Sequence, residues 1–268
     1  MLEDMPLDVE IIKHRYDQFP RIYDEYSKTF EGKLHHEIEW EILLKSHLPE
    51  NMDAKILDAG GGTGRITLPL AKMGYQITLC DVSSGMLDVA KEKLHNEGVQ
   101  NRVKIKEADI ASLPFPDESF DLVICLHGPL SIADSLKAAG ELTRVMKRGG
   151  KIIVDAHSRY WAVKNELRKN PDAALKLAKS ELNHAYDIFG DWCRVFSQKE
   201  LRELFEKNDI KVISTYGSFI ETLPLEIKQA REWSDEFLSQ VMEIMIYLGS
   251  EPSVLGLAFV LRLIGVKN

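Results

Sequence analysis

The sequence predicts an α/β protein with a doubly wound, seven-stranded and mostly parallel sheet. Short apolar segments alternate with segments of helical periodicity between residues 54 and 156. Glycines stand where helices are expected to return to strands, at Gly74 and at Gly149–Gly150. The first apolar segment also leads directly into a glycine-rich turn. This alternation is typical of βαβ units, whose parallel strands are covered by helices on both faces.

The expected elements follow from periodicity, taken in chain order. Helices are expected within residues 8–48, where Ile38, Ile42 and Leu43 recur at helical spacing before Pro49. Seven strands are expected, at residues 54–59, 75–80, 102–107, 120–126, 150–156, 210–217 and 254–262. Helices are expected between them at residues 64–73, 84–96, 133–147, 197–208 and 224–247.

Two regions of the chain are expected to be additions to the sheet. Residues 1–50 form an N-terminal helical segment, and residues 158–195 interrupt the alternation with further helices. The second region is too short for an independent domain, so we expect a helical cap insertion over one end of the sheet. Residues 51–157 form the core, and residues 196–268 complete the sheet.

Composition limits the classes of partner. The chain has 268 residues, of which 44% are hydrophobic and 28% charged, with a formal net charge of −8, as in ordinary globular proteins. The acidic balance argues against nucleic acid as the main partner, because such proteins usually carry a basic surface. The longest apolar run, at residues 254–261, is too short for a membrane span.

Cysteine usage and the N-terminus indicate the compartment. Cys80, Cys125 and Cys193 are far apart, and no Cys/His spacing suits zinc, so we expect no metal. Sparse cysteines fit a reducing interior, and the acidic N-terminus has no apolar region typical of a secretory signal. We therefore expect a cytoplasmic protein. We also expect it to be a monomer or a homodimer.

The glycine-rich turn is the sharpest signal for a ligand site. Its residues are Asp58-Ala59-Gly60-Gly61-Gly62-Thr63-Gly64-Arg65. At the carboxyl end of a parallel strand, such a turn lets a ligand approach the backbone and the following helix N-terminus. A dinucleotide fingerprint would need a glycine where Arg65 stands, and Asp58 would repel a pyrophosphate but attract an ammonium or sulfonium group. A plain glycine-rich loop and a dinucleotide site are the alternatives.

Further motifs follow the turn in order and carry a family resemblance. They are Cys80–Leu87 (CDVSSGML), Glu107–Ile110 (EADI), Leu113–Val123 (LPFPDESFDLV) and Val145–Gly150 (VMKRGG). Together with the turn, they resemble class I methyltransferases that depend on S-adenosylmethionine (SAM), in the UbiE-like, small-molecule (methyltransferase type 11) branch. The resemblance is strong over residues 54–156 and weaker over residues 196–217. It implies a Rossmann-like core that binds SAM and releases S-adenosylhomocysteine (SAH).

The resemblance also implies roles for three acidic residues. Asp58 would face the methionine part of the cofactor. Asp81 would accept hydrogen bonds from both ribose hydroxyls, which suits the paired oxygens of a carboxylate. Asp109 would accept from the adenine amino group. The alternative for Asp81 and Asp109 is a solvated turn aspartate or a helix cap.

The remaining implied cofactor contacts are glycines, apolar residues and one tyrosine. They are Gly60, Gly62 and Gly64 beneath the cofactor, Val82, Met86 and Ile110 against the adenine, Leu126 and His127 near the reacting centre, and Tyr23 closing over the cofactor. Met86 has the helical spacing of an ordinary core residue, and Tyr23 is alternatively a packing aromatic.

No catalytic residue is assigned firmly, and His127 is the candidate. It follows the fourth expected strand, and an imidazole titrates near neutrality, so it would assist deprotonation of an acceptor. Alternatively, only its backbone contacts the cofactor. His157 is a weaker candidate, and the pair His35–His36 is expected at the surface.

The function implied is methyl transfer from SAM to a small-molecule acceptor. Aromatic residues of the cap, Tyr160, Trp161, Tyr186 and Trp192, would form an apolar acceptor pocket, and core packing is their alternative role. The cap would be a mobile lid that excludes water. A methyltransferase acting on protein or RNA is the main alternative, followed by a SAM sensor and a nicotinamide oxidoreductase.

Overall fold

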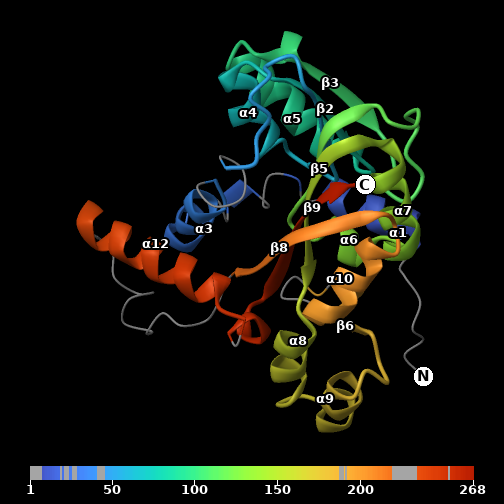
Figure 1. The fold of residues 1–268 in the computed structure, drawn as a ribbon, viewed down its shortest axis with the longest axis vertical. Coiled ribbons are helices and arrows are strands. Elements are labelled where there is room, and N and C mark those ends of the chain that lie inside the picture. The colour runs from blue at the N-terminus through green and yellow to red at the C-terminus, as the bar shows by residue number, and fades with distance from the viewer. Residues whose placement is uncertain are drawn as a thin grey trace.

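The structure is a computed structural model that describes residues 8–18, 20, 24–25, 29–40, 46–186, 190, 192–218, 234–252 and 254–268. Seven strands form one sheet in the order β3-β2-β1-β4-β5-β9-β8 (Figure 1). Their bounds are β1 (Lys55–Ala59), β2 (Gln76–Asp81), β3 (Val103–Glu107), β4 (Phe120–Cys125), β5 (Met146–His157), β8 (Ile210–Ser218) and β9 (Val260–Lys267).

The sheet is mostly parallel, as predicted. Neighbouring strands from β1 to β5 are parallel, whereas β9 is antiparallel to both β5 and β8. The chain builds outward from β1 to β2 and β3 on one side, then returns to place β4 on the other side. This reversal makes the carboxyl ends of β1 and β4 the position where open α/β sheets bind ligands.

Helices cover both faces of the sheet. They are α4 (Thr67–Met73), α5 (Ser84–Asn96), α6 (Pro129–Ile132), α7 (Ser135–Val145) and α10 (Gln198–Glu206). Ile56 and Leu122 pack in the cluster that contains apolar residues of α4 and α5. Leu57 and Val123, one position further along each strand, pack with α7 and α10. Because successive strand residues face opposite sides, this arrangement explains why consecutive residues of both strands are apolar.

Two helices whose bounds are described in the N-terminal segment reach different parts of the fold. They are α1 (Val9–Gln18) and α3 (Phe30–Glu39). Leu34 and Ile38 of α3 pack against Val241 and Met245 of α12 (Asp235–Ser250), and Figure 1 shows these helices side by side. In contrast, α1 contacts α5 beside the parallel half of the sheet.

The last strand and the neighbouring helix differ from their predicted bounds. The strand expected at 254–262 is instead a short 3-10 helix, η3 (Leu255–Leu257), followed by β9 at Val260–Lys267. The prediction followed the apolar run and ended at Arg262, whose charge is buried inside the strand. The helix expected at 224–247 is observed as α12 from Asp235, and residues 219–233 lie outside the described part.

Smaller shifts affect the elements beside the glycine-rich turn. The helix expected from residue 64 begins at Thr67, because residues 60–66 belong to the turn. The helix expected at 133–147 is observed as α7, and the short helix α6 before it was not predicted. β5 begins at Met146 instead of residue 150. Gly149 lies inside this strand at φ +74°, so the glycine pair bends a strand and does not precede one.

The cap segment is only partly helical, so the prediction of helices throughout is wrong. α8 (Arg159–Glu166) and α9 (Pro171–Ala178) are followed by β6 (His184–Tyr186) and β7 (Trp192–Arg194), which pair antiparallel. Tyr186 and Trp192 pair across these strands with ring centroids 4.9 Å apart. Cross-strand aromatic pairs stabilise strand pairing, which explains why this aromatic segment is not helical.

Within the described ranges, no helix has the length and apolarity needed to cross a membrane. The same ranges contain no group of three or more His, Cys, Asp or Glu side chains placed to hold a metal ion.

Candidate functional site

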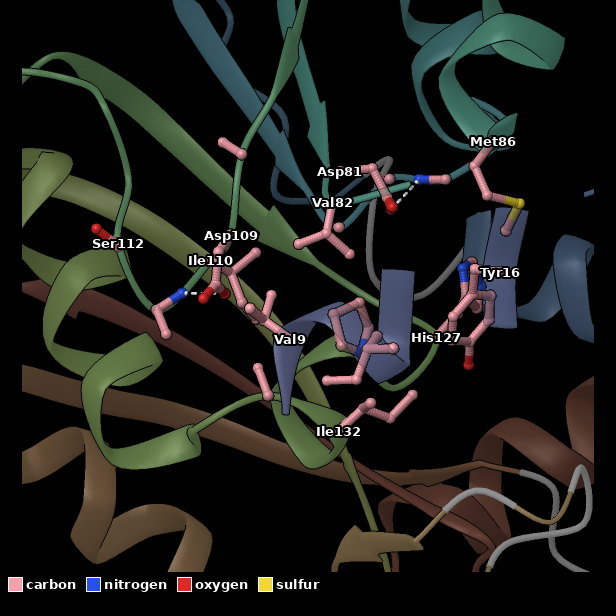
Figure 2. A pocket seen from close by; sticks show the side chains of 18 of the residues that line it. Val9, Tyr16, Asp81, Val82, Met86, Asp109, Ile110, Ser112, His127 and Ile132 are labelled. Carbon is pink, nitrogen blue, oxygen red and sulfur yellow. Dashed lines mark hydrogen bonds between the residues drawn. The ribbon is translucent and has the colours of Figure 1, made fainter. Parts of the chain in front are cut away.

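A cavity of about 550 Å³ lies beside the carboxyl ends of β1, β2 and β4 (Figure 2). Several residues predicted to bind a cofactor line it: Gly60, Gly62, Asp81, Val82, Met86, Asp109, Ile110 and His127. In Figure 2, Asp109 and Ser112 lie toward one end of the view, and His127 and Tyr16 toward the other. The volume falls within the usual range for small-molecule sites.

The glycine-rich turn forms one wall of the cavity. Gly60 has φ +70°, and a Cβ atom there would lie 2.5 Å from the Pro129 ring. A Cβ on Gly61 would lie 2.5 Å from the carboxyl carbon of Asp58. Side chains at either position would collide with well-packed neighbours, so the turn needs glycine at both. Sequence reasoning missed Gly61, although its place inside the motif was a usable signal.

Asp81 lies at the end of β2, on the cavity. Its Oδ2 accepts from the backbone N–H of Gly62 and its Oδ1 from that of Ser83, both at 2.9 Å. Burial raises the pKa of this carboxyl to about 6, although both hydrogen bonds favour the ionised form. Each oxygen keeps a lone pair, so the carboxylate can still accept hydrogen bonds from a ligand.

The lining of the cavity also combines a second carboxylate, Asp109, with apolar side chains. Asp109 Oδ1 accepts from the backbone N–H of Ala111 at 2.8 Å, which holds the turn after β3 (Figure 2). Met86 and Ile110 are each only 4% exposed, although both line the cavity. Together with Val82, these apolar side chains can contact a planar ring whose polar edge reaches Asp109.

Some predicted residues lie away from the cavity. Asp58 is buried behind the turn, where its Oδ2 accepts from the Thr67 hydroxyl at 2.6 Å. Burial raises the pKa of Asp58 to about 6, and the Thr67 hydrogen bond opposes this shift. Gly64 and Leu126 also do not line the cavity. The prediction for Tyr23 concerns a residue outside the described part.

His127 lies where the chain leaves β4, in a backbone conformation that is uncommon for a non-glycine residue. Its φ is +73°. The backbone N–H groups of His127 and Gly128 donate to the two oxygens of Asp155, at 2.9 and 3.0 Å. Its Nε2 lies 2.9 and 3.0 Å from the two carboxylate oxygens of Glu39. Neighbouring carboxylates therefore hold both the backbone and the ring.

Glu39 belongs to a buried charge cluster beside the cavity. It is 1% exposed and accepts a short hydrogen bond from Arg262 Nη2, with Arg65 Nη2 at 3.9 Å. Burial alone would raise the pKa of Glu39, but the charges of Arg262, His127 and Arg65 hold it well below its usual range. Asp155 lies 3.8 Å from Arg262 Nε. Sequence reasoning missed Glu39, Asp155 and Arg262.

Helix α1 covers part of the cavity, which sequence reasoning also missed. Val9, Ile12 and Tyr16 line it from this helix. Asp17 Oδ1 accepts from the Ser83 hydroxyl at 2.6 Å and from the Gly85 backbone N–H at 2.8 Å, at the start of α5. These hydrogen bonds fix the end of α1 beside the cavity and satisfy the first turn of α5.

The aromatic residues of the cap do not line the cavity. Trp161 is buried against Phe259, with ring centroids 4.4 Å apart, and Tyr186 pairs with Trp192. Tyr160 is half exposed and lines a separate surface cleft beside α10. The expected acceptor pocket is therefore not found at these residues.

The other candidate histidines are also away from the cavity. His157 is buried, with Nδ1 3.1 Å from Cys193 Sγ. His36 was expected at the surface but is half-buried, and burial together with the charge of Arg65 lowers its pKa. Nothing is described for the side chain of His35.

The fold and cavity define a Rossmann-like domain with a ligand site at its topological switch point. Residues 57–154 match the family model described as a methyltransferase domain. The ubiquinone/menaquinone biosynthesis C-methyltransferase UbiE of Marinomonas sp. (strain MWYL1) is 29% identical over 161 residues, covering 57% of this chain and 62% of that protein. The chain thus spans less than two thirds of the length of the curated relatives it matches.

Two solved structures share the fold over nearly the whole chain. A SAM-dependent methyltransferase from Thermotoga maritima, described as a possible histamine N-methyltransferase, has a TM-score of 0.59 and 21% identity, covering 96% of this chain and 100% of that chain. The cyclase SpnF has a TM-score of 0.64 and 16% identity, with 99% coverage of both chains. Residues 57–154 are thus similar to a methyltransferase domain, and the chain shares its fold with these solved structures.

Proposed function

We propose that this protein transfers a methyl group from SAM to a small-molecule acceptor. The observation that carries the proposal is the position of Asp81, whose carboxylate stands on the cavity between the glycine-rich turn and the start of α5. A carboxylate that accepts from two backbone N–H groups and retains lone pairs suits two ribose hydroxyls.

Other cavity residues support an adenosine-containing ligand. Val82, Met86 and Ile110 offer apolar contact for an adenine ring, and Asp109 would accept from its amino group. Arg65 lines the same cavity, and its Nε and Nη2 have no hydrogen-bond partner within the described residues. A ligand carboxylate, such as that of the methionine part of SAM, would satisfy these buried donors.

The chemistry that SAM supplies is a methyl group already activated by the sulfonium charge. The protein's tasks are then to orient the acceptor, to exclude water and to receive a proton where the acceptor carries one. His127 lines the cavity and is the residue we assign to the proton. α1 lies over the cavity and would limit access of water.

A small acceptor fits the surroundings of the cavity. Val9, Ile12 and Ile132 give it an apolar lining, and the chain's net charge of −8 is unfavourable for nucleic acid. The UbiE relatives are named for C-methylation in quinone biosynthesis, which supports a small acceptor with an apolar body. Because this chain spans only part of those proteins, their acceptor is not assigned to it.

Calorimetry with SAM, SAH and NAD tests the cofactor. We expect SAM and SAH to bind and NAD not to bind. Asp81→Ala should weaken SAH binding by roughly 2–4 kcal/mol, because two charge-assisted hydrogen bonds are lost. Asp88→Ala, at an exposed position on α5, is the matched control and should bind SAH as the unmodified protein does. Binding of NAD alone, or equal SAH affinity after Asp81→Ala, would refute the assignment.

The acceptor class needs its own experiment. SAM with a labelled methyl group is incubated with the protein and, separately, with a small-molecule extract, purified RNA or purified protein. Label in the small-molecule fraction is the expected result. Label only in RNA or protein would replace the small acceptor with a macromolecule and leave the cofactor assignment intact.

A further inference from the structure

Glu39 contacts the proposed proton acceptor from outside the α/β core. It is the last residue of α3, and both of its carboxylate oxygens lie within 3.0 Å of His127 Nε2. The carboxylate is 1% exposed, and the His127 side chain is 16% exposed. A contact this short and this buried restricts the imidazole far more than a surface ion pair would.

The contact determines which imidazole nitrogen carries hydrogen. An ionised carboxylate only accepts hydrogen bonds, so His127 Nε2 must be the donor. Arg262 and Arg65 keep Glu39 ionised by their positive charges. In the neutral ring, the other nitrogen, Nδ1, is then the one that accepts a proton. The negative charge of Glu39 also stabilises the imidazolium that forms when Nδ1 is protonated.

The backbone of His127 is held by the same cluster. Asp155 accepts from the N–H groups of His127 and Gly128, and Arg262 lies between Asp155 and Glu39. The ring and the backbone of His127 are thus fixed by two carboxylates that share one arginine. This arrangement supports the uncommon φ of +73° and leaves the imidazole few orientations.

We propose that Glu39 is a positioning residue that fixes His127 in the Nε2–H tautomer, in which a proton can add only at Nδ1. The inference rests on the proposed methyl transfer. In that reaction the acceptor's lone pair forms the bond to the methyl carbon. The carbon–sulfur bond breaks, its electron pair goes to sulfur, and the acceptor's proton passes to Nδ1 of His127. Helix α3 thereby contributes to the chemistry of the α/β core.

The charged groups that face His127 come from several elements. They are Glu39 and His36 of α3, Arg65 after the glycine-rich turn, Asp58 of β1, Asp155 of β5 and Arg262 of β9. Removing the Glu39 charge leaves the two arginines, which disfavour a protonated imidazole.

The tautomer can be read without knowing the acceptor. NMR of the protein labelled with nitrogen-15 in histidine distinguishes the two tautomers, and His127→Gln identifies the His127 signals. We expect the Nε2–H form in the unmodified protein. In Glu39→Gln we expect loss of that single form, because the ionised acceptor of the Nε2–H group is gone. Glu37→Gln, at an exposed position on the same helix, should leave the tautomer unchanged.

A second variant keeps the test valid if Glu39→Gln misfolds. Misfolding is a risk because Glu39→Gln leaves Arg262 buried without its carboxylate. Glu39→Gln combined with Arg262→Met removes the pair together and should show the same loss of the Nε2–H form. An unchanged tautomer in both variants would overturn the positioning role. Calorimetry with SAH on the unmodified protein keeps the two proposals separate, since failure to bind SAH refutes the proposed function whatever the tautomer.

Discussion

The N-terminal segment and the cap segment both extend the α/β core, but they relate differently to the cavity. Three residues of α1 line it, and Glu39 of α3 holds His127 beside it. No described residue of α8, α9, β6 or β7 lines it. In Figure 1, α8 and α9 lie together at the lower end of the molecule, whereas Ile12 of α1 packs with Ile132 of α6.

The two regions are also attached by different kinds of interaction. Arg159 of α8 is 1% exposed and donates to the carbonyl oxygens of Leu177 and Leu182, to Asn183 and to Glu200. One buried guanidinium thus joins α8 to the end of α9, the hairpin and α10. In contrast, α1 is attached at the cavity by Asp17, which is only half-buried.

This difference suggests which region can open. Separating the cap would leave a buried charge and several donors without partners, which is strongly unfavourable. Separating α1 would uncover Ile12, which packs with Ile132 and with apolar residues of the cap. It would also expose a carboxylate and a helix N-terminus, which water can solvate. We therefore expect the cap to stay attached to the core, and α1 to be the element that can move away from the cavity.

The largest effect should come from breaking the Arg159 network. Arg159→Met removes all of its donors and leaves Glu200 without its partner, so we expect a loss of roughly 3–5 kcal/mol in the free energy of unfolding. Urea denaturation measures this loss, and Arg168→Met, at an exposed position, is the control. SAH affinity of the folded protein should be unchanged. A large change in SAH affinity with little loss of stability would connect the cap to the cavity after all.

The next effect is a pH dependence of SAH affinity, which should differ from the pH dependence of the attachment of α1. The pKa of Asp81 is raised to about 6, and ligand hydroxyls need its ionised form. Below pH 6 the free protein must release a proton to bind, so SAH affinity should fall by about tenfold per pH unit. Calorimetry between pH 5 and pH 8 measures this, and Asp81→Asn should abolish the dependence. A flat profile in the unmodified protein would contradict the role of Asp81.

The attachment of α1 should weaken only at a lower pH than the binding of SAH does. Burial alone would raise the pKa of Asp17, but hydrogen bonds from Ser83 and Gly85 outweigh it and lower that pKa. Its contribution to stability is complete above the ordinary pKa of a carboxyl and is lost only as the pH falls through the lowered value. Hydrogen exchange at pH 5 should therefore find α1 still protected while SAH binding is already weakened.

The residues that line the cavity could be predicted from the sequence where their positions depend on neighbouring residues in the chain. Asp81 is the last residue of β2 and Asp109 follows β3 by two residues, so the order of parallel strands brings both to the same edge. The glycine-rich turn is likewise local, because it requires particular backbone conformations within a few residues. These are the residues that the sequence predicted and the cavity contains.

The charge cluster could not be predicted in the same way. Glu39 and Arg262 are separated by 223 residues, and no local pattern links them. A signal was nevertheless present, because Asp155 and Arg262 are the charged residues within the apolar stretches 152–156 and 260–266, and buried charges are usually paired. The cap aromatics misled for a related reason, since aromatic content alone does not distinguish a pocket from side-chain packing.

The smallest effect should come from loosening α1, and it compares the two regions directly. Asp17→Ala removes the hydrogen bonds to Ser83 and Gly85, so we expect SAH affinity to fall by about 3–10-fold, corresponding to roughly 1 kcal/mol. Glu10→Ala, at an exposed position on the same helix, is the control. Hydrogen exchange with SAH should protect α1 more strongly and leave α8 and α9 unchanged, because only α1 contacts the cavity. Stronger protection of α8 and α9 instead would restore the cap as the lid that the sequence predicted.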